Sequence, residues 1–283
     1  MRFRTEIERQ PQSLKIDHST PLLLLGSCFT DEVGSRLERD GFDVMRNPFG
    51  PLYNPASIGR CISRALERRL YTTADLTEGP HGLHCLDYAS RYSGNDTEAL
   101  LQQINNTLES VSDMLSRRPI VILTLGSSYV FELKDTGRIV GNCHKFPSDR
   151  FTRRRLTTDE CARILEGTVT KLHDAGIDDV ILTVSPIRHL ADGLHGNVLS
   201  KSTLQLAADS ITGSRCHYFP SYEIMLDDLR DYRFYASDMK HPSEVAVDYI
   251  YEVFSEYYFT KSTVAAAREA RSRALAAQHR PIL

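Results

Sequence analysis

The chain has 283 residues, of which 41% are hydrophobic and 25% are charged, and its formal net charge is −3. This length and apolar content are sufficient for a full hydrophobic core in one compact domain. Charges of both signs are interspersed, which excludes an electrostatic case for nucleic acid or an anionic membrane and favours a small-molecule or glycan substrate. No apolar run reaches the length of a membrane span, and no apolar secretion-signal segment follows the N-terminus. We therefore expect a cytoplasmic protein.

Residues 22–32, Leu-Leu-Leu-Leu-Gly-Ser-Cys-Phe-Thr-Asp-Glu, predict a buried strand that turns at Gly26 into a helix. Ser27 then lies at the strand-to-helix elbow, at the carboxyl edge of a sheet. Its hydroxyl can act as a nucleophile there, and its backbone N–H can donate to an oxyanion. The alternative is that Gly26 and Ser27 only shape the turn and cap the helix.

Strand and helix patterns alternate along the rest of the chain and predict a mostly parallel sheet with helices on both faces, an α/β fold. Residues 1–20 are polar and form a lead-in segment, residues 21–260 form the domain, and residues 261–283 form a helical C-terminal tail. Further buried strands are expected at residues 42–45, 120–125, 179–184 and 216–219, and helices at about residues 29–40, 58–66, 97–116, 157–175, 200–211 and 243–254.

Two stretches interrupt this alternation. Residues 71–95 lose periodicity and predict a loop or short-hairpin insertion. Residues 129–133 and 138–144 predict a hairpin that returns Asn142 and His144 towards Gly126. The basic run at residues 151–155 is expected to be a solvated face.

Asp238 and His241 are spaced at i and i+3 in one loop near the end of the chain. A serine becomes a useful nucleophile when an imidazole accepts its proton and a carboxylate orients that imidazole. Ser27, His241 and Asp238 can supply these three groups. Asp238-x-x-His241 can equally serve only to cap a helix.

These motifs together resemble the SGNH (GDSL-like) hydrolase superfamily and, within it, the GSCFA family. Gly26-Ser27-Cys28-Phe29-Thr30 is similar to the motif that names that family, with threonine in place of the final alanine. Further support comes from the stretches at residues 46–50, 124–126, 142–145, 185–189 and 238–242, which read RNPFG, TLG, NCHK, SPIRH and DMKHP. The resemblance implies a three-layer α/β/α sandwich with a flavodoxin-like sheet and a hairpin insertion.

The resemblance also implies a serine esterase or acyltransferase that forms an acyl-serine and needs no cofactor. Ser27 would be the nucleophile, His241 its base and Asp238 the residue that orients the base. Ser27 and Gly50 would supply oxyanion N–H groups. The superfamily's asparagine after the third strand is missing from Gly126-Ser127-Ser128-Tyr129, and we expect Asn142 to replace it.

Three further residues are candidates for substrate binding. Gly126 ends a buried strand at the carboxyl edge. His144 can contact substrate or be satisfied by the hairpin backbone. Arg188 can bind a substrate carboxylate or form a structural ion pair. Cys28 is a rival nucleophile whose side chain should point away from that of Ser27, and packing is the expected role.

Two other classes of function stay open. The six cysteines are scattered without a C-x-x-C pair, which favours neither disulfides nor zinc. A zinc-dependent hydrolase would need the insertion to bring together His81, His84, Cys85, Cys143 and His144. A non-catalytic carbohydrate-binding or scaffold protein on the same fold is the other alternative.

Overall fold

The computed structural model describes residues 5–10, 12–79 and 82–278. Within them, five parallel strands form the central sheet in the order β11-β10-β6-β1-β2. This order is that of a flavodoxin-like sheet. The strands are β1 (Leu22–Gly26), β2 (Val44–Arg46), β6 (Ile120–Leu125), β10 (Val180–Val184) and β11 (Cys216–Phe219).

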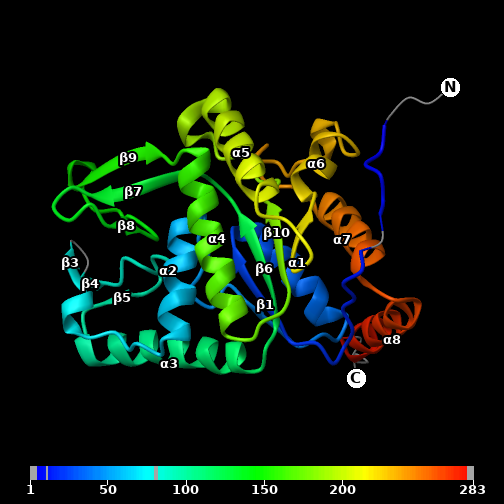
Figure 1. The fold of residues 1–283 in the computed structure, drawn as a ribbon, viewed down its shortest axis with the longest axis horizontal. Helices are drawn as coiled ribbons and strands as arrows, with labels where there is room; N and C mark the ends of the chain where they lie inside the picture. Colours follow the sequence, from blue (N-terminus) through cyan, green and yellow to red (C-terminus); the bar gives the residue numbers. More distant parts are fainter. Residues whose placement is uncertain (1–4, 11, 80–81, 279–283) are drawn as a thin grey trace, which may run out of the picture.

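Helices cover both faces of this sheet (Figure 1), which confirms the expected three-layer arrangement. Successive side chains of a strand point to opposite faces of the sheet, so the side chains of β1 pack into two hydrophobic cores, one on each face. Leu23 and Leu25 pack under α2, α3, α4 and α5, while Leu22 and Leu24 pack under α1, α6, α7 and α8. The helices are α1 (Cys28–Arg39), α2 (Pro55–Leu66), α3 (Thr97–Ser116), α4 (Thr158–Asp174), α5 (Gly193–Asp209), α6 (Ser221–Leu226), α7 (Glu244–Tyr258) and α8 (Lys261–Gln278).

Two small antiparallel sheets lie beside the sandwich. The first joins β3 (Thr77–Gly79), β4 (Gly82–His84) and β5 (Ser93–Gly94) in the expected insertion. The second joins β8 (Ile139–Val140), β7 (Tyr129–Leu133) and β9 (Phe151–Arg155). The basic run is therefore a strand that pairs with β7. Arg153 pairs with Asp192, and Arg154 pairs with Glu132 and Glu160. The described residues also form four short 3-10 helices: η1 (Thr73–Asp75), η2 (Ser148–Arg150), η3 (Leu190–Asp192) and η4 (Tyr232–Phe234).

Most expected elements agree with the structure, and the differences have local causes. The helix expected at residues 200–211 begins earlier, at Gly193, because the Gly-rich stretch before it is already helical. Helix α6 follows Pro220 directly and was not expected. It is only six residues long, too short to show a helical period.

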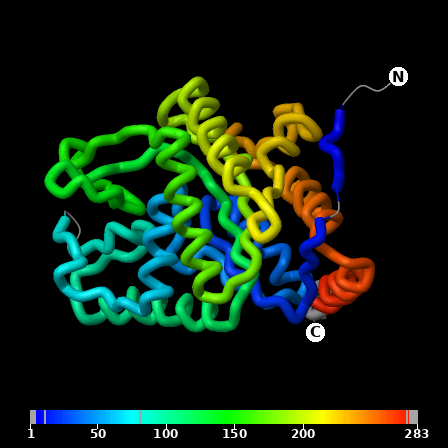
Figure 2. Tube along the Cα trace, in the orientation of Figure 1, coloured from blue at the N-terminus to red at the C-terminus, as the bar shows by residue number. Residues whose placement is uncertain are grey.

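The C-terminal helix α8 lies against α1 and α7 (Figure 2), where Arg271 pairs with the fully buried Asp40 at the end of α1. The division into a lead-in, a domain and a tail stays a prediction. None of the described helices combines the length and the apolar composition that a membrane crossing requires. The order of the sheet reverses between β1 and β6, and the crevice at their carboxyl ends is where ligands bind in such folds.

Candidate active site

The β1–α1 elbow points Ser27 into the protein. Ser27 is the N-cap of α1, and its hydroxyl accepts the backbone N–H of Phe29 at 3.3 Å. The same hydroxyl donates to the Ser185 hydroxyl at 2.8 Å, and the residue has no exposed surface. The Ser27 side chain therefore caps α1, which is the alternative that the sequence left open. The structure does not bring this side chain into a cavity with His241.

Asn47 holds the elbow in this conformation from the loop after β2. Its carboxamide oxygen accepts the N–H of Gly26 at 2.9 Å, and its nitrogen donates to the Ser27 carbonyl and to Asp31. Gly26 itself has φ +149°, and a Cβ atom there would lie 2.1 Å from the Thr124 carbonyl oxygen. Only glycine fits this close approach of β1 to β6.

Cys28, one residue further, faces a cavity of about 400 Å³ that His241 also lines. The Cys28 Sγ atom lies 3.3 Å from the Tyr53 hydroxyl. Burial and the contact with Cys28 raise the pKa of Tyr53, so this phenol stays protonated. Cys28 and His241 also line a smaller adjoining cavity together with Ile187 and Pro242. The structure thus brings Cys28, and not Ser27, into one space with His241.

The expected pair of Asp238 and His241 is present. Asp238 Oδ2 lies 2.5 Å from His241 Nδ1, and its other oxygen accepts the backbone N–H groups of Lys240 and His241. These hydrogen bonds lower the pKa of Asp238, which keeps it a carboxylate. The carboxylate favours the tautomer with its proton on Nδ1 and leaves Nε2 as the atom that can accept a proton.

The two backbone groups expected to bind an oxyanion already have partners. The Ser27 N–H donates to the Thr124 carbonyl at 3.1 Å, and the Gly50 N–H donates to the Asn47 carbonyl at 2.8 Å. Gly50 is buried, and a Cβ atom there would lie 2.3 Å from that of Ala89. The N–H groups of Ser27 and Gly50, which the resemblance assigned to the oxyanion hole, are therefore already hydrogen-bonded within the elbow and within a tight turn.

Two asparagine side chains line the cavity instead. The Asn142 oxygen accepts the N–H of His144 at 2.8 Å. Asn54 caps α2, and its oxygen accepts the N–H of Ser57 at 2.9 Å. In each case the oxygen is fixed by backbone, which leaves the NH₂ group as the donor for a ligand. Asn54 was not singled out from the sequence, although its place before Pro55 is a typical N-cap position.

The three expected substrate-binding residues lie at different depths. His144 follows β8 and is buried against the insertion, 3.1 Å from His84 (Nδ1 to Nδ1) and 3.0 Å from the Tyr88 carbonyl. Burial lowers its pKa, and it does not line the cavity. Gly126 separates Ser27 from Tyr53 and His189, and a Cβ atom would meet each within 3.3 Å. Arg188 reaches the cavity from the loop after β10.

A buried lysine and a neutral histidine lie next to the elbow. Lys201 is 1% exposed and donates to the carbonyls of Gly126 and Ser185, each at 2.7 Å. Burial lowers its pKa to about 7. His189 lines the cavity, and burial together with the charge of Lys201 lowers its pKa to about 3. The sequence placed Lys201 on a helix and gave no sign that it turns inward.

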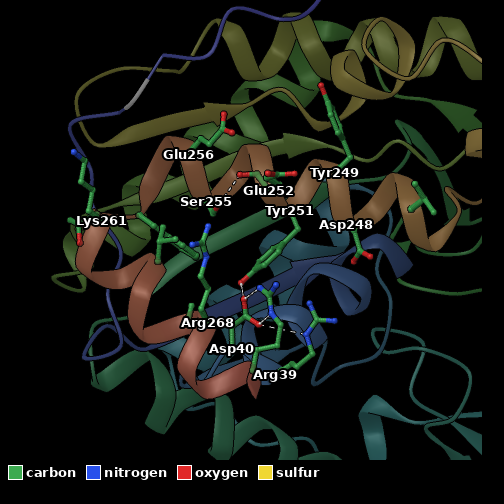
Figure 3. A pocket seen from close by; sticks show the side chains of 16 residues that line it. Arg39, Asp40, Asp248, Tyr249, Tyr251, Glu252, Ser255, Glu256, Lys261 and Arg268 are labelled. Atoms are coloured by element: carbon green, nitrogen blue, oxygen red, sulfur yellow. Dashed lines mark hydrogen bonds and ion pairs between the residues drawn. The ribbon is translucent and has the colours of Figure 1, made fainter. Parts of the chain in front are cut away.

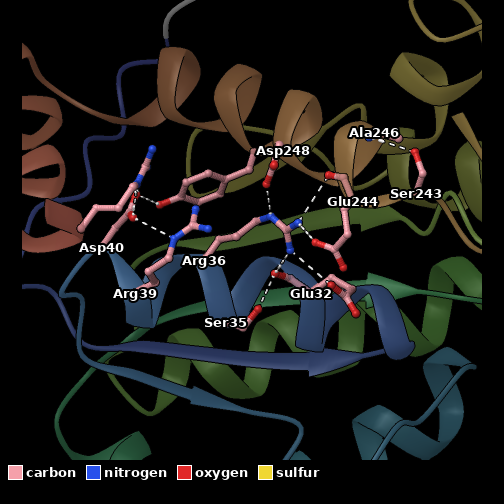
Figure 4. Close-up of polar contacts among 11 residues, drawn as sticks. Glu32, Ser35, Arg36, Arg39, Asp40, Ser243, Glu244, Ala246 and Asp248 are labelled. Atoms are coloured by element: carbon pink, nitrogen blue, oxygen red, sulfur yellow. Dashed lines mark hydrogen bonds and ion pairs between the residues drawn. The ribbon is translucent and has the colours of Figure 1, made fainter. Parts of the chain in front are cut away.

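Arg36 joins the helix that begins with Cys28 to the helix that follows His241 (Figure 4). Its side chain is 5% exposed and donates to Glu244 and Asp248 of α7, each at 2.7 Å, and to Glu32 of α1 at 3.2 Å. The three carboxylates are 48–81% exposed. The arginine, which lies in the last turn of α1, therefore fixes the beginning of α7 against α1.

A larger cavity, of about 780 Å³, lies between α7, α8 and the end of α1 (Figure 3). It is lined by charged side chains that include Arg39 and Asp40, and Asp40 is already bound by Arg271 and Tyr251. Ser27, Cys28, Asp238 and His241 do not line it. Size alone therefore does not identify an active site, and the candidate is the smaller cavity that Cys28 and His241 line together.

The metal alternative finds no support in the described part of the chain. His84 and His144 meet, but no group of three or more histidine, cysteine or acidic side chains among the described residues is arranged to hold a metal ion. His81, which that alternative also needs, lies outside the described residues. The cysteines described in the structure are free thiols.

Comparison with known proteins identifies the family of the chain. No curated protein matches the chain. The model of the GSCFA family matches residues 21–254, which include the elbow, the asparagines of the cavity and the Asp238–His241 pair. The chain belongs to the GSCFA family.

Proposed function

We propose that this protein is an SGNH-like acyl-transfer enzyme, an O-acyl esterase or acyltransferase, in which Cys28 is the nucleophile in place of Ser27. The observation that carries the proposal is that Cys28 and His241 line one cavity while Asp238 holds His241 at 2.5 Å. A thiol with a neighbouring imidazole and an orienting carboxylate is a recognised nucleophilic arrangement. A small-molecule or glycan ester as substrate and a cytoplasmic location remain predictions.

The reaction follows from these groups. His241 Nε2 takes the thiol proton as Cys28 Sγ forms a bond to the ester carbonyl carbon, which becomes tetrahedral. The tetrahedral intermediate then breaks its C–O bond, and the alcohol leaves with the proton from His241. Water or a second alcohol, deprotonated by His241, attacks the resulting thioester and releases the Cys28 thiolate. Hydrolysis and transfer differ only in this last acceptor.

Several groups support the charged species along this path. The Tyr53 hydroxyl, 3.3 Å from Sγ, can donate to the thiolate. The positive end of the α1 dipole also faces Cys28, its first residue. The NH₂ groups of Asn142 and Asn54 are the side-chain donors for the oxyanion, and their fixed oxygens make them preorganised.

Hydrolysis of p-nitrophenyl acetate by Cys28→Ala and Ser27→Ala tests the assignment. We expect Cys28→Ala to lose at least about a thousandfold in kcat/KM. Ser27→Ala should stay within about threefold of the wild type, because its hydroxyl caps a helix. Cys143→Ala is the matched control, since Cys143 lines the same cavity.

Labelling with iodoacetamide and peptide mapping gives a second readout. We expect Cys28 to be alkylated faster than the other cysteines, and His241→Asn to slow that labelling selectively. Loss of activity in Ser27→Ala with full activity in Cys28→Ala would restore the acyl-serine mechanism. A wild-type protein that neither turns over the ester nor labels at Cys28 would instead favour the non-catalytic binding protein.

A further inference from the structure

An apolar groove of about 340 Å³ lies between the start of α5 and α6, which are neighbours at the top of Figure 1. Leu194 and Val198 of α5 and Leu226 of α6 line it and are 58%, 52% and 41% exposed. Met225 and Leu229 are buried beneath it. Contiguous apolar side chains left open to water are typical of a binding site.

This groove shares a wall with the cavity that contains Cys28. Arg188 lines both spaces. Its guanidinium donates to the Met239 carbonyl at 3.1 Å and lies over the rings of Tyr232 and Tyr235, which belong to the groove. The stem of an arginine offers apolar surface while its charge stays hydrated. Arg188 therefore separates the groove from the cavity, and an apolar chain can pass from one to the other along its stem.

Two more contacts tie the groove to the site. Asn197 lines the groove, and its oxygen accepts the N–H of His189, which lines the cavity, at 2.9 Å. The loop that carries His241 also walls both spaces, because Tyr235 faces the groove and Lys240 faces the cavity. The groove is thus one side chain away from the space in which an acyl group on Cys28 would lie.

We infer that this groove binds the acyl chain of the substrate, so that the enzyme acts on esters of medium-length aliphatic acids. The inference rests on the proposed acyl-transfer function. The apolar floor of Met225 and Leu229 suits an alkyl chain. Each methylene that leaves water for this surface should raise kcat/KM about fourfold.

The test is a series of p-nitrophenyl esters with acetyl, butyryl and octanoyl groups, assayed with the wild type and with Val198→Asp. We expect the wild type to prefer octanoate over acetate by at least tenfold. Val198→Asp should lose at least tenfold on octanoate and keep its activity on acetate. Leu206→Asp is the matched control, because Leu206 is on the same helix, 60% exposed, and outside the groove.

A second measurement separates the groove from the chemistry. Sodium octanoate is titrated into Cys28→Ala, with and without Val198→Asp, by calorimetry. Octanoate binding that Val198→Asp removes would support the groove even if no ester were hydrolysed. A flat chain-length profile in an active wild type would overturn the inference. So would a Val198→Asp variant that matches Leu206→Asp on every ester, or one that only turns a dimer into a monomer and thereby marks the groove as a self-association face.

Discussion

The two sides of the cavity around Cys28 are held in different ways. On the sheet side, Cys28 follows an elbow whose Ser27, Ser185 and Lys201 are at least 98% buried. On the opposite side, Asp238 and His241 are 44% and 48% exposed and are arranged by hydrogen bonds within their own loop. The position of the proposed nucleophile, Cys28, thus depends on packing of the core, and that of the proposed base, His241, on a short local motif. Substitutions on the loop should change chemistry alone, while those on the sheet side should also change folding.

The largest effect on turnover, apart from loss of Cys28 itself, is expected for His241→Asn. Removing a general base costs about a hundred- to ten-thousandfold in rate. Because His241 is half exposed, the free energy of unfolding in urea should stay within about 0.5 kcal/mol of the wild type. Asp238→Asn is the companion variant and should lower kcat/KM less. A His241→Asn protein that unfolds much more easily would break the contrast between the two sides.

The local motif was predictable from the sequence, and the elbow was predictable only in part. Asp238-x-x-His241 is a three-residue spacing in one loop, so its pairing needs no knowledge of the fold. The strand before Gly26 and the helix after it also follow from apolar runs and periodicity. Which of Ser27 and Cys28 faces the cavity depends on the backbone angles of the N-cap, φ −68° and ψ 175°, and no periodicity encodes these. The preference of serine for N-cap positions is the signal that favours the observed arrangement.

Long-range contacts account for what the sequence missed. His144 was expected near Gly126, but the insertion pairs it with His84, and those residues are 60 positions apart. Gly50 lies where the resemblance expects an oxyanion donor, yet its N–H closes a turn onto Asn47. Lys201 reads as an ordinary helical lysine because its burial depends on the ends of β6 and β10. Such positions are set by the assembled sheet.

An intermediate effect is expected for Arg36→Met, which removes the link between the two sides. Arg36 holds α7 against α1 through Glu244 and Asp248, and charge-assisted hydrogen bonds of this kind contribute about 1.5–3 kcal/mol. Because the carboxylates are mostly exposed, the loss of stability should lie at the lower end of that range. We expect kcat/KM for p-nitrophenyl acetate to fall about tenfold.

Glu256→Gln is the control for Arg36→Met, because it removes another α7 ion pair, with Arg9. Iodoacetamide labelling of Cys28 should slow in Arg36→Met and remain unchanged in Glu256→Gln. Unchanged turnover and labelling in Arg36→Met, at any loss of stability, would mean that the position of His241 is set by its own loop alone.

The smallest effect on turnover, and the clearest on folding, is expected for Lys201→Met. The folded-state pKa of Lys201 is about 7, below the ordinary lysine value of about 10.4. Between these two pH values the unfolded chain holds a proton that the folded chain releases, so the free energy of unfolding rises with pH. Methionine has no proton to release and removes this rise.

The measurement is urea unfolding of the wild type and of Lys201→Met at pH 7 and pH 9.5. The increase in stability over this interval should be larger in the wild type by on the order of 3 kcal/mol. The difference between the two proteins is the quantity to compare, because the tyrosines titrate equally in both. At pH 7 the Lys201→Met variant should be no less stable than the wild type. The variant loses two hydrogen bonds to the carbonyls of Gly126 and Ser185. It also avoids the free-energy cost of burying a charge, and this gain offsets that loss. Parallel stability curves would mean that the ammonium keeps its proton in the folded protein. The sheet side would then carry a fixed positive charge beneath the elbow, and the contrast with the loop would lie in charge as well as in burial.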